Sequence, residues 1–235
     1  MELYPSNYTK AKIYHWLHTA AGQASGIKES VKSSLEGRIW FTYGGQTLNY
    51  YEGTNALPST VSRVLDDGTS QITRYEYNGF GKTTKVTDPV GRISRFNYST
   101  NELDLLEVRQ QIGTNVANTD LLGLFTYNSS HLPLTTVDAA GRTNFFGYNT
   151  NGQLTALTNT LGETVTMLYD ADGYLTNITG SLPGSTTSFT YDSYGRVQTV
   201  TDSEGFTVTT DYDAADRPTK ITYPDTTTDL YDYTF

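Results

Sequence analysis

Residues 191–205 decide the fold: Tyr191-Asp192-Ser193-Tyr194-Gly195-Arg196-Val197-Gln198-Thr199-Val200-Thr201-Asp202-Ser203-Glu204-Gly205. Asp favours turns because its side chain bonds to backbone N–H groups two residues on, and Gly adopts conformations that other residues avoid. Thr and Val favour strands. The stretch therefore predicts a strand that ends at Tyr191, a turn, a return strand and a second turn.

The same pattern recurs back to the first third of the chain. Its anchoring tyrosines are separated by 21, 29, 21, 21, 22, 21 and 21 residues. They are Tyr77, Tyr98, Tyr127, Tyr148, Tyr169, Tyr191, Tyr212 and Tyr233. A fixed period in the twenties indicates a repeat architecture, in which each unit packs mainly against its neighbours. The sequence predicts an all-β array of antiparallel β-hairpins that forms a curved or spiralling open sheet.

We predict that the repeat is defined by a tyrosine that ends one strand and by Asp and Gly residues in the two turns. The residues assigned to this role are Tyr77, Gly81, Asp88, Gly91, Tyr98, Tyr127, Asp138, Gly141, Tyr148, Gly152, Gly162, Tyr169, Asp170, Gly173, Tyr191, Asp192, Gly195, Asp202, Gly205, Tyr212 and Asp213.

Aromatic residues two apart precede several turns: Tyr75/Tyr77, Phe96/Tyr98, Phe125/Tyr127, Phe146/Tyr148 and Phe189/Tyr191. Residues two apart on a strand point to the same face of the sheet. Each pair is therefore predicted to form part of an aromatic ladder along one face, and its role is predicted to be packing and not ligand binding.

The array is predicted to cover residues 39–235 in about eight units, with an enlarged unit at 99–126 built on strands at 103–112 and 121–127 around Gly113-Thr114-Asn115. Residues 1–38 form a separate N-terminal segment. In it, residues 9–19 fit a strand buried on both faces about as well as a helix. Residues 20–26 are predicted to be a loop.

Bulk composition excludes several classes of function. The net charge is −9 and no block of Lys and Arg forms a phosphate-binding stripe, so nucleic acid is not expected as a partner. Cysteine is absent, which excludes disulfides and thiolate chemistry. No apolar run approaches the ~20 residues of a membrane helix. The first residues do not resemble a signal peptide.

Candidate reactive groups are few, and we predict no catalytic residue, no metal site and no cofactor. His15 and His18 would share a face on a helix but not on a strand, and no third ligand is evident. His131 is isolated in a turn. Asp170-Ala171-Asp172-Gly173 lacks the remaining ligands of a calcium loop, although weak calcium binding in stacked Asp turns stays open. An enzyme is the least expected class.

The units resemble the YD repeat, also called the RHS repeat, of bacterial RHS polymorphic toxins, shell components of insecticidal toxin complexes, and teneurins. The matching stretches are Tyr191-Asp192-Ser193-Tyr194-Gly195-Arg196, Tyr169-Asp170-Ala171-Asp172-Gly173, and Tyr212-Asp213-Ala214-Ala215-Asp216-Arg217, with Asp216 at the usual glycine position. The resemblance implies hairpins that spiral into a hollow shell around a toxin or another domain of the same polypeptide.

The resemblance also implies a secreted or cell-surface bacterial protein whose export signal lies outside this chain. Asp88-Pro89-Val90-Gly91 has the letters of the family's self-cleavage signature but lies in an ordinary repeat turn, so we do not expect proteolysis there. The chain ends mid-unit at Phe235, which predicts a fragment, or a subunit whose edges meet the remaining shell or a second copy. Alternatives are an adhesion module that binds glycans or a protein through aromatic faces, and self-assembly into a filament or ring.

Overall fold

The structure is a computed structural model that describes residues 10–113, 115, 117 and 119–233, and all its regular elements are β-strands. The strands are β1 (Ile13–His18), β2 (Ala24–Lys32), β3 (Ile39–Tyr43), β4 (Pro58–Val64), β5 (Ser70–Tyr77), β6 (Thr83–Thr87), β7 (Ile93–Tyr98), β8 (Leu105–Gln111), β9 (Thr119–Tyr127), β10 (Pro133–Asp138), β11 (Thr143–Tyr148), β12 (Leu154–Thr158), β13 (Thr164–Tyr169), β14 (Leu175–Thr179), β15 (Thr186–Tyr191), β16 (Val197–Thr201), β17 (Thr207–Tyr212), β18 (Pro218–Thr222) and β19 (Thr228–Leu230).

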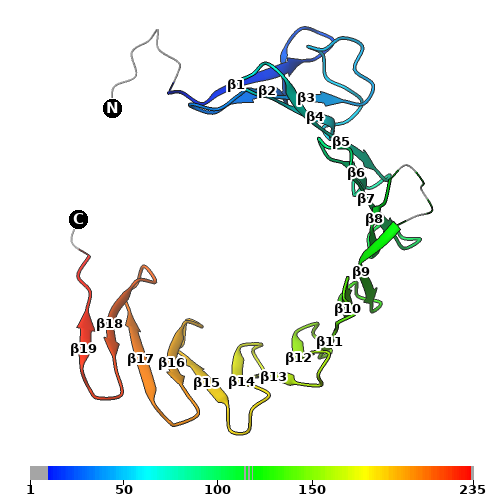
Figure 1. Cartoon of the computed structure of the whole chain (residues 1–235). Helices are drawn as coiled ribbons and strands as arrows, with labels where there is room; N and C mark the ends of the chain where they lie inside the picture. The colour runs from blue at the N-terminus through cyan, green and yellow to red at the C-terminus, as the bar shows by residue number, and fades with distance from the viewer. Residues whose placement is uncertain (1–9, 114, 116, 118, 234–235) are drawn as a thin grey trace. The chain divides into compact units, whose positions relative to one another are not determined.

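The strands pair antiparallel in sequence order, as Figure 1 shows. In one repeat, β15 pairs with β16 through Phe189 and Val200, and β16 pairs with β17 through Val200 and Val208. The chain divides into an N-terminal unit, Met1–Leu124, and a C-terminal unit, Phe125–Phe235. Among the described strands, the first and last strands of each unit do not pair with each other. The predicted all-β open array of antiparallel hairpins is confirmed.

The turns use the predicted chemistry. Oδ1 of Asp192 accepts hydrogen bonds from the backbone N–H groups of Tyr194 (2.9 Å) and Arg196 (3.0 Å). Gly195 follows with a φ of 78°. Asp216 occupies the equivalent position of the next unit, as the sequence pattern predicted. Its φ is 61°. The conformation is therefore kept even where glycine is replaced.

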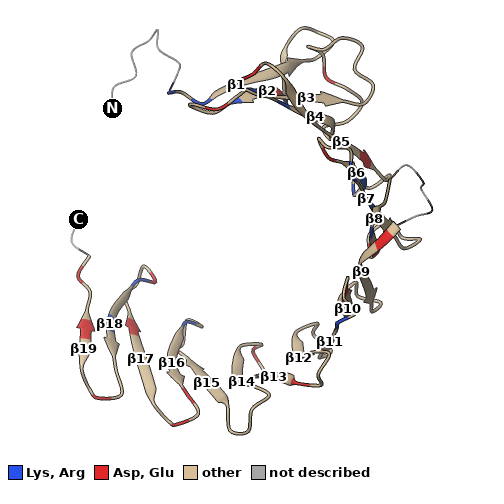
Figure 2. Ribbon diagram, in the orientation of Figure 1, with Lys and Arg blue, Asp and Glu red and all other residues tan. Residues whose placement is uncertain are grey.

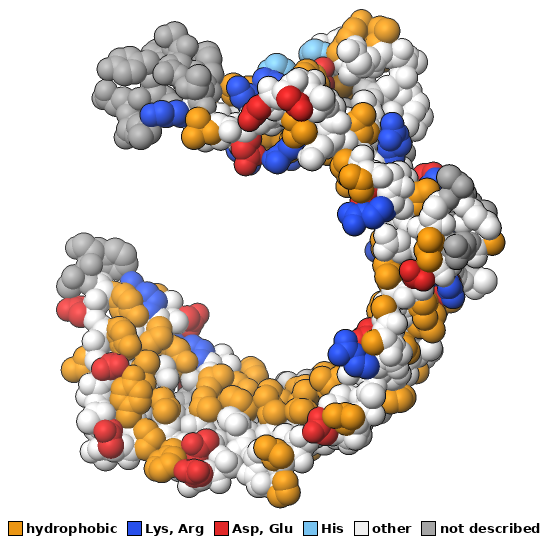
Figure 3. Space-filling view, viewed as in Figure 1, with side chains coloured by type: hydrophobic (Ala, Val, Ile, Leu, Met, Phe, Trp, Pro, Cys, Tyr) orange, Lys and Arg blue, Asp and Glu red, His pale blue; other side chains and the backbone are white. Residues whose placement is uncertain are grey.

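The two faces of the C-terminal unit differ in composition. One face, which we call the apolar face, carries Phe146, Leu157, Val165, Met167, Ile178, Phe189, Val200, Val208 and Ile221. The opposite face, the threonine face, carries Thr158, Thr164, Thr166, Thr179, Thr186, Thr190, Thr199, Thr201, Thr207, Thr209, Thr222 and Thr228. Figure 3 shows apolar side chains gathered along one side of this unit.

The apolar face is only half-buried, because the described part of this unit places no second layer against it. Among the described residues, the only buried apolar side chains are Leu17 and Tyr43, both in the N-terminal unit. Domains normally bury an apolar sheet face against another element. The fold therefore leaves the apolar face of this unit partly exposed.

The N-terminal segment corrects two expectations. Residues 9–19 contain a strand, β1, but this strand is not buried on both faces: Leu17 is fully buried, whereas Trp16 is 42% exposed. Residues 24–26 belong to β2 and not to the predicted loop, because Ala24 pairs with His18. Pairing with a neighbouring strand here outweighs the weak strand preference of the Ala-Ser-Gly sequence.

The enlarged unit contains the predicted long hairpin. β8 and β9 pair from Gln111 and Thr119 onward, with a register shift after Val108. Thr114 lies outside the described residues, as do Phe235 and residues 1–9. The predicted domain boundary at residue 38 stays a prediction, and β2 pairs with β3 across it through Val31 and Ile39.

Candidate functional site

The candidate site is the junction between successive hairpins, best seen at Tyr191. This residue ends β15, and its hydroxyl group donates a hydrogen bond of 2.8 Å to the backbone oxygen of Leu175. Leu175 begins β14 in the preceding hairpin, where it pairs with Tyr169. Burial raises the pKa of Tyr191, with smaller contributions from Asp170 and Tyr174. We call this hydrogen bond, from a strand-ending tyrosine to the preceding hairpin, the tyrosine bridge.

The tyrosine bridge recurs along both units. The donor and acceptor pairs are Tyr43 and Lys28, Tyr77 and Pro58, Tyr98 and Thr83, Tyr148 and Pro133, Tyr169 and Leu154, and Tyr212 and Val197, at 2.7–3.0 Å. Tyr43 was missed by the sequence pattern, because 34 residues separate it from Tyr77. The signal available was a tyrosine that ends a strand before Gly44-Gly45. The bridge is thus a repeated contact between consecutive hairpins.

A second tyrosine supports the bridge at Tyr191. The ring of Tyr174 stacks on Tyr191 with centroids 4.8 Å apart and planes at 30°. Tyr174 also lies against the Cα of Gly195, so a Cβ atom at position 195 would overlap its hydroxyl group. Glycine is therefore favoured at position 195 for two reasons, its positive φ and the close approach of a neighbouring hairpin.

Arg196 connects the same hairpin to the following one. Its guanidinium group pairs with Asp192 at 2.7 Å in its own turn. It also donates to the backbone oxygen of Asp213 at 2.8 Å and to Asp216 at 3.0 Å in the next turn. The group lies 4.7 Å from the ring centroid of Tyr212. This hairpin is therefore joined backward through Tyr191 and forward through Arg196.

The turns at the other end of the hairpins repeat a related arrangement. Asp138 accepts bonds from the backbone N–H groups of Ala140 and Arg142, and its Oδ2 pairs with the Arg142 side chain at 2.7 Å. The hydrogen bond from the Arg142 backbone N–H lowers the pKa of Asp138 most, and the hydrogen bond from the Arg142 side chain lowers it further. Asp88 pairs with Arg92 in the same way at 2.6 Å. Figure 2 shows further acidic residues at the ends of hairpins.

The structure places every residue assigned to the repeat in a turn or at a strand end. The assigned glycines, Gly81, Gly91, Gly141, Gly152, Gly162, Gly173, Gly195 and Gly205, all have positive φ. The assigned aspartates, Asp88, Asp138, Asp170, Asp192, Asp202 and Asp213, each accept two backbone N–H bonds. Tyr127 ends β9. Their role in defining the repeat stays a prediction that this placement supports.

Threonine pairs link neighbouring strands on the threonine face and were not anticipated. Hydroxyl groups hydrogen bond between Thr158 and Thr164 (2.8 Å) and between Thr201 and Thr207 (2.8 Å). They also bond between Thr190 and Thr199 at 2.6 Å. Such cross-strand pairs stabilise a sheet directly. The high threonine content of the strands is the sequence signal that could have predicted these pairs.

The other candidate groups are not brought together. His15 and His18 lie on opposite faces of β1, and His15 is 3.8 Å from Glu29. His131 lies in a turn with a φ of 61°. No three His, Cys, Asp or Glu side chains gather as a metal site in the described part of the chain. None of the described residues forms a helix able to cross a membrane.

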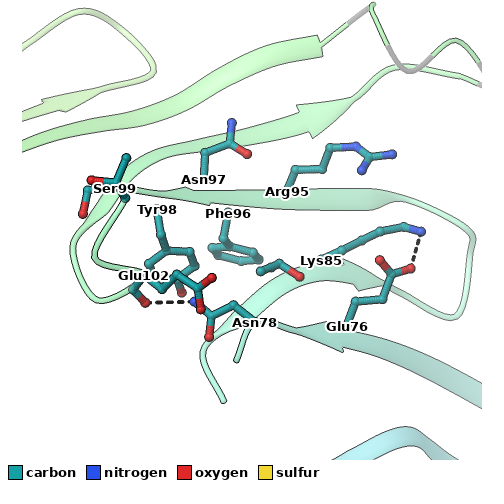
Figure 4. A pocket seen from close by; sticks show the side chains of 11 residues that line it. Glu76, Asn78, Lys85, Arg95, Phe96, Asn97, Tyr98, Ser99 and Glu102 are labelled. Atoms are coloured by element: carbon teal, nitrogen blue, oxygen red, sulfur yellow. Dashed lines mark hydrogen bonds and ion pairs between the residues drawn. The ribbon is translucent and has the colours of Figure 1, made fainter. Parts of the chain in front are cut away.

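A hollow of about 700 Å³ lies in the N-terminal unit, bounded by residues of β5 to β7 and their turns (Figure 4). Glu76 and Lys85 point toward one another and pair at 2.7 Å. Asn78 reaches the backbone oxygen of Glu102 at 2.8 Å. These two contacts join side chains and backbone from different turns and strands around the hollow.

Comparison with solved structures gives the same architecture. The crystal structure of TcdB2-TccC3 matches with a TM-score of 0.66 at 13% identity, over 92% of this chain and 13% of that chain. TcdB2-TccC3-Cdc42 matches with a TM-score of 0.66 at 14% identity, over 94% of this chain and 13% of that chain. The Tc holotoxin pore of Photorhabdus luminescens matches with a TM-score of 0.63 at 13% identity, over 92% of this chain and 12% of that chain. The chain therefore spans about an eighth of these chains.

The fold and its repeated junctions define a β-hairpin repeat protein. Residues 148–183 and 191–228 match the family model described as RHS Repeat. A comparison with curated proteins gives no match. These two segments are similar to the RHS repeat, also called the YD repeat, and the fold of the chain is similar to that of the solved structures above.

Proposed function

We propose that this chain is a non-enzymatic structural segment of an RHS-type shell that encloses or presents another part of its parent polypeptide. The observation that carries the proposal is the apolar face of the C-terminal unit, left half-exposed by the described residues. Phe189, Val200 and Val208 form one continuous row across three strands of this face. A sheet with such a face needs a second surface to cover it, because apolar area in contact with water is unfavourable.

The opposite face suits contact with water. Threonine hydroxyl groups there bond to each other across strands and remain able to bond to solvent. A wall with one apolar and one hydroxyl-rich side separates an enclosed chain from the surrounding water. A bacterial secreted or cell-surface setting fits this role.

A structural role also accounts for the titratable residues. The aspartates of the assigned turns accept backbone hydrogen bonds, and Asp138 and Asp192 also pair with arginines of their own turns. The strand-ending tyrosines donate to backbone oxygens of the preceding hairpin. Since these groups already serve the turns and junctions, the repeat needs no chemistry beyond folding.

Single-cysteine labelling of the full-length parent polypeptide tests the proposal, in a background where any cysteine outside this chain is replaced; this chain itself contains no cysteine. Val200→Cys places a thiol on the apolar face, and Thr199→Cys places one on the threonine face of the same strand. We expect a water-soluble maleimide to label Thr199→Cys rapidly and Val200→Cys slowly in the parent. We expect Val200→Cys to react faster once the enclosed part is deleted. Equal labelling of the two positions in the intact parent would contradict enclosure on this face.

A second candidate, glycan binding in adhesion, rests on the exposed aromatic residues of β1. The rings of Tyr14 and Trp16 are 40% and 42% exposed and lie 6.0 Å apart with planes at 18°. Lys12 and Lys28 lie 5.4 and 5.7 Å from the Tyr14 ring centroid. A glycan array probed with the chain and with Trp16→Ala tests it. Binding that Trp16→Ala leaves unchanged would contradict a site here.

A further inference from the structure

Two asparagines of this chain precede a glycine, Asn78 before Gly79 and Asn151 before Gly152. In such a pair the backbone nitrogen of the glycine can attack the asparagine carboxamide, because glycine has no side chain to hinder the approach. As dipeptides the two pairs are identical. The structure separates them by what each carboxamide contacts.

The side chain of Asn78 is fixed by three hydrogen bonds. Its Oδ1 accepts from the backbone N–H groups of Phe80 (3.1 Å) and Lys82 (2.9 Å). Its Nδ2 donates to the backbone oxygen of Glu102 at 2.8 Å. Rotation of this carboxamide toward the nitrogen of Gly79 would break all three bonds together.

The side chain of Asn151 is exposed and makes no hydrogen bond within the described chain. The turn is capped by a different residue, since Oδ1 of Asn149 accepts the backbone N–H groups of Asn151 and Gln153 at 3.0 Å each. The carboxamide of Asn151 is therefore free to rotate. The glycine nitrogens do not distinguish the sites, because Gly152 donates to Asn149 at 3.0 Å and Gly79 donates to Glu102 at 3.1 Å.

We propose that Asn151 is a site of spontaneous deamidation and that Asn78 is protected. The nitrogen of Gly152 loses its proton and forms a bond to Cγ of Asn151. The bond from Cγ to the carboxamide nitrogen breaks, and that nitrogen leaves as ammonia with the proton. Water then opens the resulting succinimide at either carbonyl, which gives aspartate or isoaspartate at position 151.

The isoaspartate product would change the turn itself. It adds a methylene group to the main chain between Asn149 and Gly152, whose spacing is set by the hydrogen bond from Gly152 to Asn149. This turn joins β11 to β12, and Leu154 at the start of β12 accepts the tyrosine bridge from Tyr169. Deamidation would therefore act on one junction of the array.

Incubation of the folded chain in mildly alkaline buffer, followed by proteolysis and mass spectrometry, tests the proposal. We expect the peptide with Asn151 to be converted to the acid at least about tenfold faster than the peptide with Asn78, because three hydrogen bonds must be given up at Asn78. An isoaspartate-specific methyltransferase should label the former peptide only.

The same incubation in concentrated urea is the control, since unfolding removes the bonds at Asn78 and should bring the two rates together. Asn151→Ser should abolish the methyltransferase signal. Equal rates in the folded chain, a faster reaction at Asn78, or no reaction at Asn151 would each overturn the proposal.

Discussion

The hydroxyl group of Tyr191 lies 2.8 Å from the backbone oxygen of Leu175, and this hydrogen bond joins two consecutive hairpins. The acceptor, Leu175, is the first residue of β14. It pairs with Tyr169, the equivalent tyrosine of the preceding unit, on the neighbouring strand. Tyr169 in turn donates to Leu154 at 2.9 Å. The bridges of the C-terminal unit therefore follow one another along the sheet, each anchored where the previous hairpin begins its return strand.

Tyr191→Phe removes this bond while keeping the ring that stacks on Tyr174. We expect the free energy of unfolding, measured in urea, to fall by about 1 kcal/mol, because one hydrogen bond is lost and a backbone oxygen is left without its partner. Tyr194→Phe is the control, since that residue is 81% exposed and its hydroxyl group makes no hydrogen bond within the described chain. An equal loss in both variants would contradict the bridge.

Alkaline pH should weaken the array through the same tyrosines. Burial raises the pKa of Tyr98, Tyr148 and Tyr191 above the ordinary value of about 10. The unfolded chain then loses these protons first, so their contribution to stability is full below about pH 10 and decreases as the pH rises through the folded pKa values.

Urea unfolding between about pH 8 and about pH 11 measures this effect. We expect the free energy of unfolding of Tyr191→Phe to fall less steeply with pH than that of the unchanged chain. An identical slope would show that this tyrosine does not contribute.

Gly195→Ala and Gly205→Ala form a matched pair, because both glycines have positive φ, 78° and 87°. We expect Gly205→Ala to lower the free energy of unfolding by about 1–2 kcal/mol, the cost of a left-handed conformation for alanine. Gly195→Ala should lower it further, since its methyl group would meet Tyr174, whereas the space beside Gly205 is open.

A double-mutant cycle separates the two causes. Adding Tyr174→Ala should bring the cost of Gly195→Ala close to that of Gly205→Ala. If the cost of Gly195→Ala does not depend on Tyr174, the close approach of the neighbouring hairpin is not limiting.

Acid should weaken the turns capped by aspartate. The bonds from the Arg142 backbone and side chain lower the pKa of Asp138. Its contribution is therefore full above the unfolded pKa of about 3.9 and is lost as the pH falls through the lower folded pKa. We expect Asp138→Asn, which keeps an acceptor oxygen but loses the charge, to show a smaller drop in thermal stability on acidification. Glu204→Gln is the control, since the Glu204 side chain makes no hydrogen bond in the described chain; a reduced acid sensitivity there would point to general charge effects.

From Tyr77 onward, the sequence by itself determined the repeat with its strands and turns. Asp192 and Gly195 lie within one turn, and the chemistry that fixes them is local: a side chain that bonds to N–H groups a few residues on, and a backbone that tolerates positive φ. Alternating residues also identified which aromatic side chains share a face, as for Tyr75 and Tyr77, whose rings stack 6.3 Å apart. These features depend only on residues within one repeat unit, so they can be predicted without knowing how the units pack.

Only the tertiary structure decided what joins one unit to the next. The acceptor of each tyrosine hydroxyl is a backbone oxygen, which carries no residue signature, and the arrangement of Tyr174 against Gly195 depends on how two hairpins pack. The same holds for Asn78 and Asn151, which are both followed by glycine and whose hydrogen bonds differ. Local turn chemistry can be predicted from neighbouring residues, whereas contacts between hairpins depend on register and twist that emerge when the strands pair.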